Sequence, residues 1–255
     1  MRRLALTSWT THHLLTGTEQ PAITLLELPA QARAAGIDAL EICHFHIHDT
    51  GDAALAELRG AIDAAGIEPF SILIDMGDIS SADAERRSAD IGTIEDWIDV
   101  AAKLGTRAVR IVGGEASPDD QAAFGRAEEA LRHLASYAAT RNIRALTENF
   151  KALLSTAQNC NRMLDALDGQ LGMCADIGNF PAAQRVDEFR HVVARAESVH
   201  VKGSYGADGR LNRAELEACL EASVLADFGG PYTLVFDRGG DTWAGVAELA
   251  GVVRP

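Results

Sequence analysis

Short apolar runs recur along the chain, and longer amphipathic segments separate them. The runs lie at residues 4–9, 38–43, 67–74, 107–112, 143–148, 170–176, 197–202 and 231–237, and we interpret them as strands. Between them lie Ala-, Leu- and Glu-rich segments, such as 82–104 and 119–140, that are long enough for helices. Alternation of strand and helix over about eight units predicts parallel strands joined by right-handed crossovers.

Residues typical of helix ends support this division. Three predicted helices are followed by glycine, at Gly36, Gly66 and Gly105. Glycine suits this place because the chain enters the left-handed region as it turns back. Three predicted helices begin near Ser81, Asp119 and Ser155, which are good N-cap types.

Eight such units can close into a barrel or form an open, doubly wound sheet. The Gly-x-Gly-x-x-Gly fingerprint of a dinucleotide-binding open sheet does not follow the first run. In the late strands, bulky apolar residues alternate with small or polar ones, as Leu171, Met173 and Ala175 do with Gly172, Cys174 and Asp176. This alternation places the bulky set toward the helices and the polar set toward a barrel axis. We therefore predict an α/β fold: a single-domain (β/α)8 TIM barrel over residues 1–255.

Composition narrows the function classes. The formal net charge is −14, which argues against a nucleic-acid partner and against an anionic membrane surface. The four cysteines show no C-x-x-C pairing and no framework spacing typical of secreted proteins. The first residues do not resemble a signal peptide, and no window approaches the roughly 20 apolar residues of a membrane span. We expect a cytoplasmic protein.

Four polar residues each close an apolar run in the second half of the chain: Glu148, Asp176, His200 and Asp237. Each alone could cap a helix or make a structural hydrogen bond. Together, on consecutive strands of a closed barrel, they would meet at the mouth where such barrels do their chemistry. Three carboxylates and one imidazole favour one divalent ion such as Mn²⁺, Mg²⁺ or Co²⁺, with Mn²⁺ our first choice and Zn²⁺ an alternative.

Further candidates surround this set. Arg110 and Lys202 face inward by parity and could either neutralise developing negative charge or form salt bridges to the site carboxylates. Trp9 could stack on a sugar face or simply pack in the core. Glu41 faces inward from the second strand, and we place it with His44 among the candidate substrate-binding residues. His44, His46 and His48 alternate along an extended segment, but parity does not aim them at the ion.

The chain resembles the xylose-isomerase-like barrel superfamily, the sugar phosphate isomerase/epimerase group. The resemblance covers nearly the whole chain and rests on segments 34–41 and 98–113, Thr147-Glu-Asn149, Asp176-Ile-Gly-Asn179 and Val199-His-Val-Lys202. This group includes ketose 3-epimerases, hydroxypyruvate isomerases and inosose dehydratases. The resemblance implies that Glu148 and Asp237 serve both as ligands and as an acid–base pair. It also allows a homo-oligomer, because dimers and tetramers are common in the family.

The chain departs from the family pattern at three places. The last ligand is usually glutamate, and Asp237 is shorter by one C–C bond, about 1.5 Å, so the ion must sit closer or a water must bridge. Phe150 follows Asn149 where many members have histidine, and Gly203 follows Lys202 where many have aspartate. The apurinic endonuclease branch needs more histidines than this chain supplies at the matching positions.

These observations predict a metal-dependent isomerase or epimerase of a small keto-sugar or polyol. The ion would polarise a carbonyl, and a carboxylate would remove the neighbouring proton to give an enediolate. A dehydratase or lyase shares this first step and is the main alternative. A barrel that only binds a partner is an alternative from another class, although such a barrel has no physical reason to keep three convergent polar groups.

Overall fold

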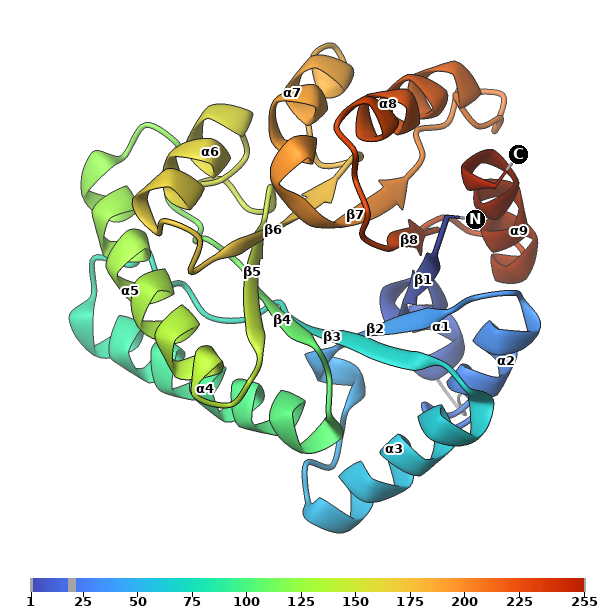
Figure 1. Ribbon diagram of the computed structural model, residues 1–255, viewed down its shortest axis with the longest axis horizontal. Coiled ribbons are helices and arrows are strands. Elements are labelled where there is room, and N and C mark those ends of the chain that lie inside the picture. The colour runs from blue at the N-terminus through green and yellow to red at the C-terminus, as the bar shows by residue number, and fades with distance from the viewer. Residues whose placement is uncertain (1, 18–21, 255) are drawn as a thin grey trace.

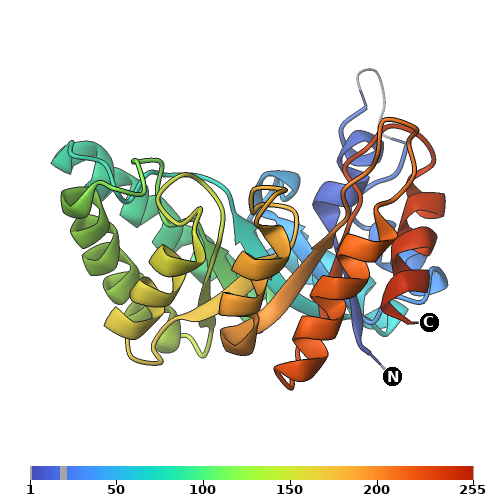
Figure 2. The same cartoon turned by 90° about the horizontal axis from the view of Figure 1, so that it is seen from above.

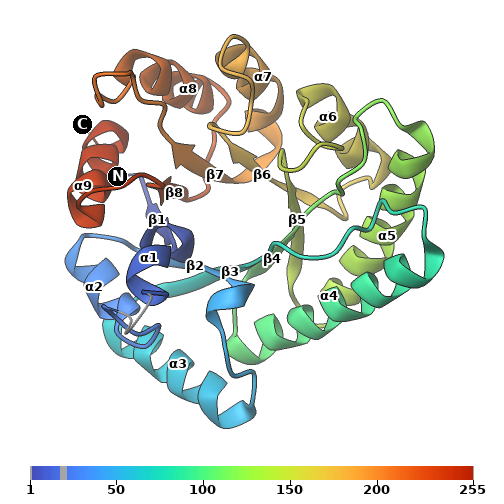
Figure 3. The same cartoon turned by 180° about the vertical axis from the view of Figure 1, so that it is seen from behind.

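The computed structural model describes residues 2–17 and 22–254. Within this part of the chain, eight parallel strands close into a barrel in sequence order, with β8 hydrogen-bonded to β1. Helices surround the barrel on its outside (Figures 1 and 3). The predicted (β/α)8 barrel is confirmed. None of the helices in the described residues is long and apolar enough to cross a membrane.

The elements follow the predicted segments closely. The strands are β1 Leu4–Thr7, β2 Ala39–Cys43, β3 Glu68–Ile74, β4 Ala108–Ile111, β5 Arg144–Glu148, β6 Gly172–Asp176, β7 Ala196–Lys202 and β8 Tyr232–Val235. The α-helices are α1 His12–Leu15, α2 Leu28–Ala34, α3 Asp52–Ala65, α4 Ala84–Leu104, α5 Gln121–Ala139, α6 Ala157–Ala166, α7 Arg185–Val192, α8 Arg213–Leu225 and α9 Thr242–Val253. Short 3₁₀ turns lie at Ser8–Thr11, His44–His46 and Val193–Arg195.

Two apolar layers hold the barrel together. The larger one lies between strands and helices and contains the outward-facing residues predicted from parity, including Met173, Ala175, Val199 and Leu234. A small inner cluster fills the barrel itself, formed by Ala5, Ala39, Phe70, Ala108 and Leu146. Because these inner residues come from the early parts of their strands, the carboxyl ends remain free for polar side chains.

The ends of the chain meet beside β1. Figure 2 shows both termini on the same side of the molecule, and α9 packs next to the first strand. Arg2 donates a hydrogen bond to the Val253 carbonyl at 2.8 Å, and Arg254 donates to the Arg2 carbonyl at 2.6 Å. These bonds tie the end of α9 to the residue that precedes β1 by two positions.

The helix boundaries correct the predicted N-caps by one or two residues. Gly66 and Gly105 are left-handed C-caps as predicted, with φ of 63° and 72°. The N-cap of α4 is Asp83, because its carboxylate accepts bonds from the free backbone N–H groups of the first turn. Ser81 instead accepts a bond from the Asp83 N–H, outside the helix. Likewise Asp120 and Thr156 cap α5 and α6 in place of the predicted Asp119 and Ser155.

Strand β8 is shorter than predicted. It ends at Val235, and the next backbone N–H, that of Phe236, donates to Thr10 Oγ1 at 3.0 Å. The prediction that this strand runs to residue 237 is wrong, because a side-chain hydroxyl replaces the strand partner at this point. Asp237 therefore lies in the loop after the strand.

The buried layer between α5 and the strands gives a stability prediction. Phe124 is fully buried, so replacing it with alanine should lower the free energy of unfolding by about 3–5 kcal/mol. Leu225 is 79% exposed, and Leu225→Ala should change it by less than about 0.5 kcal/mol. Urea unfolding followed by circular dichroism measures both. Equal midpoints for the two variants would contradict the packing described.

Candidate active site

A cavity of about 250 Å³ opens at the carboxyl ends of the strands. Each of the eight strands contributes at least one residue to its lining. The lining residues are Thr7, Trp9, Cys43, Phe45, Leu73, Asp75, Arg110, Glu148, Phe150, Asp176, Asn179, His200, Lys202 and Val235. The volume suits a small molecule of the size of one sugar ring.

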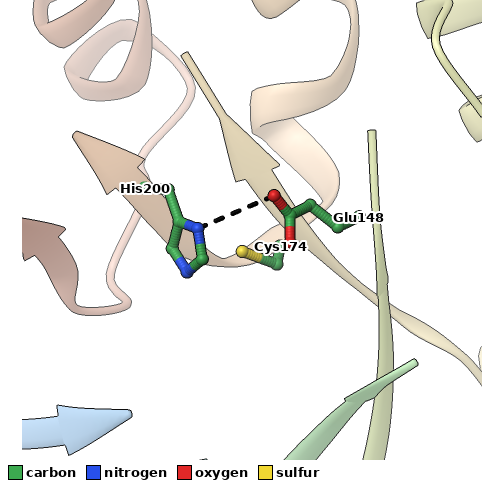
Figure 4. A group of neighbouring side chains, drawn as sticks. All are labelled: Glu148, Cys174 and His200. Atoms are coloured by element: carbon green, nitrogen blue, oxygen red, sulfur yellow. Dashed lines mark ion pairs between the residues drawn. The ribbon is translucent and has the colours of Figure 1, made fainter. Parts of the chain in front are cut away.

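Three of the four predicted metal ligands converge in this cavity. His200 Nδ1 lies 3.7 Å from Glu148 Oε1 and 3.5 Å from Asp176 Oδ2. All three side chains are at least 95% buried. Figure 4 shows Glu148 and His200 pointing toward each other, with Cys174 between the strands that carry them.

The opposite edge of the His200 ring, at Nε2, contacts Glu41. His200 Nε2 lies 2.7 Å from Glu41 Oε2, and the Glu41 side chain is 1% exposed. This contact spans the barrel from β2 to β7. Because a carboxylate fixes Nε2 as a donor, Nδ1 is directed toward Glu148 and Asp176. Glu41, predicted as a substrate-binding residue, is thus placed against His200.

A buried cation, Arg110, contacts two of the carboxylates that line the cavity. Arg110 donates to Asp75 Oδ1 at 2.5 Å, and its Nε lies 2.8 Å from Glu148 Oε2. The second contact is an ion pair whose geometry is too bent for a hydrogen bond, so Glu148 Oε2 accepts none from the described residues. Burial opposes the charge of Arg110, but Asp75 and Glu148 outweigh it and raise the pKa of the guanidinium.

The environment shifts the titration of the central groups. Burial raises the pKa of Glu148 above its ordinary value, against the lowering effect of Arg110 and His200. For His200, burial favours the neutral ring, but Cys174, Glu41 and Glu148 outweigh it and raise the pKa. Burial raises the pKa of the Cys174 thiol to about 11, so this thiol stays uncharged near neutral pH.

The fourth predicted ligand, Asp237, lies apart from the other three. Its Oδ2 is 2.7 Å from Lys202 Nζ, and the two side chains are 31% and 29% exposed. Burial opposes the charge of Lys202, but Asp237 outweighs it and raises the pKa of the amine. Both predicted cations, Arg110 and Lys202, therefore form salt bridges to carboxylates, which is one of the two roles predicted for them.

Hydrogen bonds between side chains and the backbone hold Asp176 and the three residues after it in place at the end of β6. Asn149 donates to the Asp176 carbonyl at 2.9 Å and accepts from the Asp176 N–H at 2.8 Å, which ties β5 to β6. Asp176 Oδ1 accepts from the Gly178 and Asn179 N–H groups at 2.6 and 3.1 Å. Gly178 packs against Lys202, since a Cβ there would lie 2.6 Å from that side chain. Asn179 in turn donates to Glu148 Oε1 at 2.9 Å.

The donor set fits a divalent cation. Among the described residues, Glu148, Cys174 and His200 offer ligand atoms within 4.8 Å of one another, and Asp176 lies next to them. Because the Cys174 thiol is held neutral, the carboxylates and the imidazole are the stronger donors. Glu148 Oε2 forms an ion pair with Arg110 but accepts no hydrogen bond from the described residues, which leaves a lone pair available for an ion.

The two remaining predicted substrate-binding residues, Trp9 and His44, lie in different surroundings. Trp9 lines the cavity and is 41% exposed, which leaves its ring free to meet a ligand. His44 packs edge-on against Trp97 and Phe45, and its Nδ1 accepts a bond from the Asp75 N–H at 3.2 Å. His44 therefore holds the end of β3.

Several cavity residues went unpredicted. Asp75 follows the apolar run that ends at Ile74, so it carries the same strand-end signal as Glu148 and Asp176. Asn179 could have been found as the polar residue three places after Asp176. Phe150 entered the sequence analysis only as a departure from the family pattern, and its ring lies 5.6 Å from the Arg110 guanidinium carbon.

A sequence profile described as a xylose isomerase-like TIM barrel matches residues 29–233. The chain belongs to this family. The match confirms the resemblance seen in the sequence motifs. No curated protein sequence matches the chain.

Solved structures share the fold at low identity. L-ribulose 3-epimerase has a TM-score of 0.80 at 18% identity, covering 99% of this chain and 93% of that one. A 3-keto-D-glucoside 4-epimerase from E. coli has a TM-score of 0.75 at 16% identity, covering 100% and 99%. A xylose isomerase-like barrel from Mycobacterium smegmatis in complex with magnesium has a TM-score of 0.71 at 18% identity, covering 100% and 96%. At these identities the likeness establishes the fold.

The contact between Glu41 and His200 gives a second prediction. Glu41→Ala should lower the free energy of unfolding by about 3–5 kcal/mol, because it leaves a charged imidazole buried without its partner. Glu41→Gln should cost less, since the amide oxygen still accepts from Nε2. The matched control is Glu217→Ala, which removes an exposed i,i+4 pair with Arg213 and should shift the urea midpoint little. A Glu41→Ala midpoint equal to that of the control would rule out a charged, carboxylate-bound His200.

Proposed function

We propose that the chain is a divalent-metal-dependent isomerase or epimerase of a small keto-sugar or polyol. One observation carries this proposal. Glu148 is buried at the bottom of a sugar-sized cavity, where an imidazole, a guanidinium and a second carboxylate surround it. The sugar epimerases among the solved structures of this fold support the reaction class.

Glu148, Asp176 and His200 would hold the ion, and Asp237 would join them after leaving Lys202. Mn²⁺ is the ion that we favour for this oxygen-rich set, with Mg²⁺, Co²⁺ and Zn²⁺ as alternatives. When bound, the ion supplies Lewis-acid polarisation of a substrate carbonyl. Glu41 holds His200 in the orientation that faces it.

Glu148 is the proposed proton acceptor. Burial makes its carboxylate more basic than an exposed glutamate, which favours removal of a proton next to a carbonyl. Arg110 and Lys202 both line the cavity and would stabilise the negative charge of the enediolate. Trp9 and Phe150 would contact the sugar ring and exclude water from it.

Epimerisation and isomerisation need a group that returns the proton. We propose Asp237 for this role, once the salt bridge to Lys202 opens. That bridge is about one-third exposed, so opening it costs far less than separating the buried pairs around Glu148.

The placement of Asp237 also favours a second candidate function. With Asp237 held by Lys202, Glu148 would abstract the proton and then deliver it to the leaving hydroxyl, so that water departs and one acid–base group completes the elimination. A metal-dependent dehydratase or lyase of a keto-sugar or keto-cyclitol is therefore our alternative. For either function we propose a reducing, cytoplasmic setting, which the four free, buried cysteines support.

Solvent deuterium exchange tests the proposed function. The metal-loaded protein should introduce deuterium into D-psicose or L-ribulose next to the carbonyl, detected by NMR. Glu148→Gln should lower the exchange rate by about 10²–10⁴-fold, because it removes the base. Removal of the metal with a chelator should stop exchange, and Mn²⁺ should restore it.

The control for this experiment is Glu217→Gln, which changes a surface carboxylate on α8 and should leave the rate unchanged. A deuterated epimer or isomer as product supports the first function, whereas a dehydrated product supports the alternative. Undiminished exchange in Glu148→Gln would contradict the role of this residue.

A further inference from the structure

A second cavity, of about 290 Å³, lies beside the first and shares Trp9 with it. The loop after β1 and the loop after β8 form its walls. Its lining residues are Trp9, Thr10, His12, His13, Phe236, Asp237, Arg238, Gly239 and Gly240. The boundary between the cavities is the salt bridge whose lysine, Lys202, lines the first cavity and whose aspartate, Asp237, lines the second.

A chain of hydrogen bonds determines which ring nitrogen of His12 carries the proton. The Cys43 N–H donates to Ser8 Oγ at 2.8 Å. Ser8 is fully buried, so its hydroxyl proton needs an acceptor, which His46 Nδ1 provides at 2.7 Å. His46 then carries its proton on Nε2 and donates to His12 Nδ1 at 2.9 Å.

His12 consequently keeps its own N–H at Nε2. Burial, together with His12 and His48, lowers the pKa of His46 to about 4, so this buried ring stays neutral and the direction of the bonds holds near neutral pH. The second cavity thereby has an N–H donor in a set position.

An aromatic surface runs between the two cavities. The indole of Trp9 is 41% exposed, and its ring stacks on His12 at 4.8 Å with an interplanar angle of 27°. Phe45 meets the same indole edge-on at 6.2 Å. A rigid, exposed aromatic ring of this kind suits contact with the apolar face of a pyranose.

The charges of the second cavity disfavour a phosphate. Asp237 lines it, and Asp241 already accepts bonds from the Trp243 and Ala244 N–H groups at the start of α9. The free N–H groups of a helix start would otherwise be the natural phosphate site. Arg238 donates to the Gly209 carbonyl and lies 4.2 Å from the Tyr205 ring centre. The carboxylate of Asp237, the engaged guanidinium of Arg238 and a helix start already capped by Asp241 favour an uncharged, hydroxyl-bearing group.

We propose that the second cavity is a subsite for the second, uncharged sugar ring of a keto-glycoside, whose keto-bearing ring occupies the first cavity. This inference rests on the proposed function for the placement of the reacting ring. Trp9 contacts both rings, and the His12 Nε2–H donates to a hydroxyl of the outer one.

A pair of probes that differ only in the outer ring tests this proposal: 3-keto-trehalose and 3-keto-glucose. For the metal-loaded wild type, kcat/KM for deuterium exchange should be at least about 10-fold higher with the disaccharide. Gly239→Phe should abolish this preference, because a Cβ at Gly239 meets nothing within 4 Å and the added ring enters the cavity. His12→Leu should reduce the preference, because the leucine side chain carries no N–H donor.

The matched control is Gly229→Phe, which adds the same ring in open space at the opposite end of the barrel. It should leave the preference intact. Equal kcat/KM for the two probes in the wild type would overturn the proposal, as would a preference that survives Gly239→Phe.

Binding separates this proposal from the proposed function. If neither probe exchanges deuterium, the proposed function fails, and saturation-transfer NMR with trehalose then decides the subsite alone. Transfer to the sugar that is lost in Gly239→Phe and kept in Gly229→Phe supports the subsite. Transfer that is absent, or equal in both variants, overturns it.

Discussion

The ion pair between Glu41 and His200 is the contact on which the rest of the site depends. Both side chains are at least 95% buried, so neither can rely on water to stabilise its charge. By holding Nε2, Glu41 directs Nδ1 toward Glu148 and Asp176, which lie on the two preceding strands. Without it the imidazole would be free to rotate, and Nδ1 would no longer be directed toward the two carboxylates.

The charged groups around this pair differ in how deeply they are buried. The ion pair between Glu148 and Arg110 is almost fully buried, whereas the salt bridge between Lys202 and Asp237 is partly exposed. A buried network keeps one geometry because each broken contact leaves an uncompensated charge. The exposed bridge can open at low cost, so it is the part of the site able to change when a substrate arrives. It also stands between the two cavities.

The sequence was sufficient for the barrel and for three of the convergent groups. Glu148, Asp176 and His200 end their strands with inward parity, and such positions point to one mouth whatever the details of the loops. Asp237 could not be placed in this way, because Thr10 captures the Phe236 N–H and ends β8 two residues early. Glu41 faces inward as predicted, but its contact across the barrel to β7 depends on ring closure and register, which periodicity does not specify. Asp75 carried the right signal and was overlooked.

The central claim is that Glu148, Asp176 and His200 bind one divalent ion in the first cavity. Anomalous diffraction from crystals soaked in Mn²⁺ tests it most directly. We expect one strong peak about 2.0–2.3 Å from His200 Nδ1 and from carboxylate oxygens of Glu148 and Asp176. A peak bound elsewhere, or an empty cavity in crystals that take up Mn²⁺ at other sites, would contradict it.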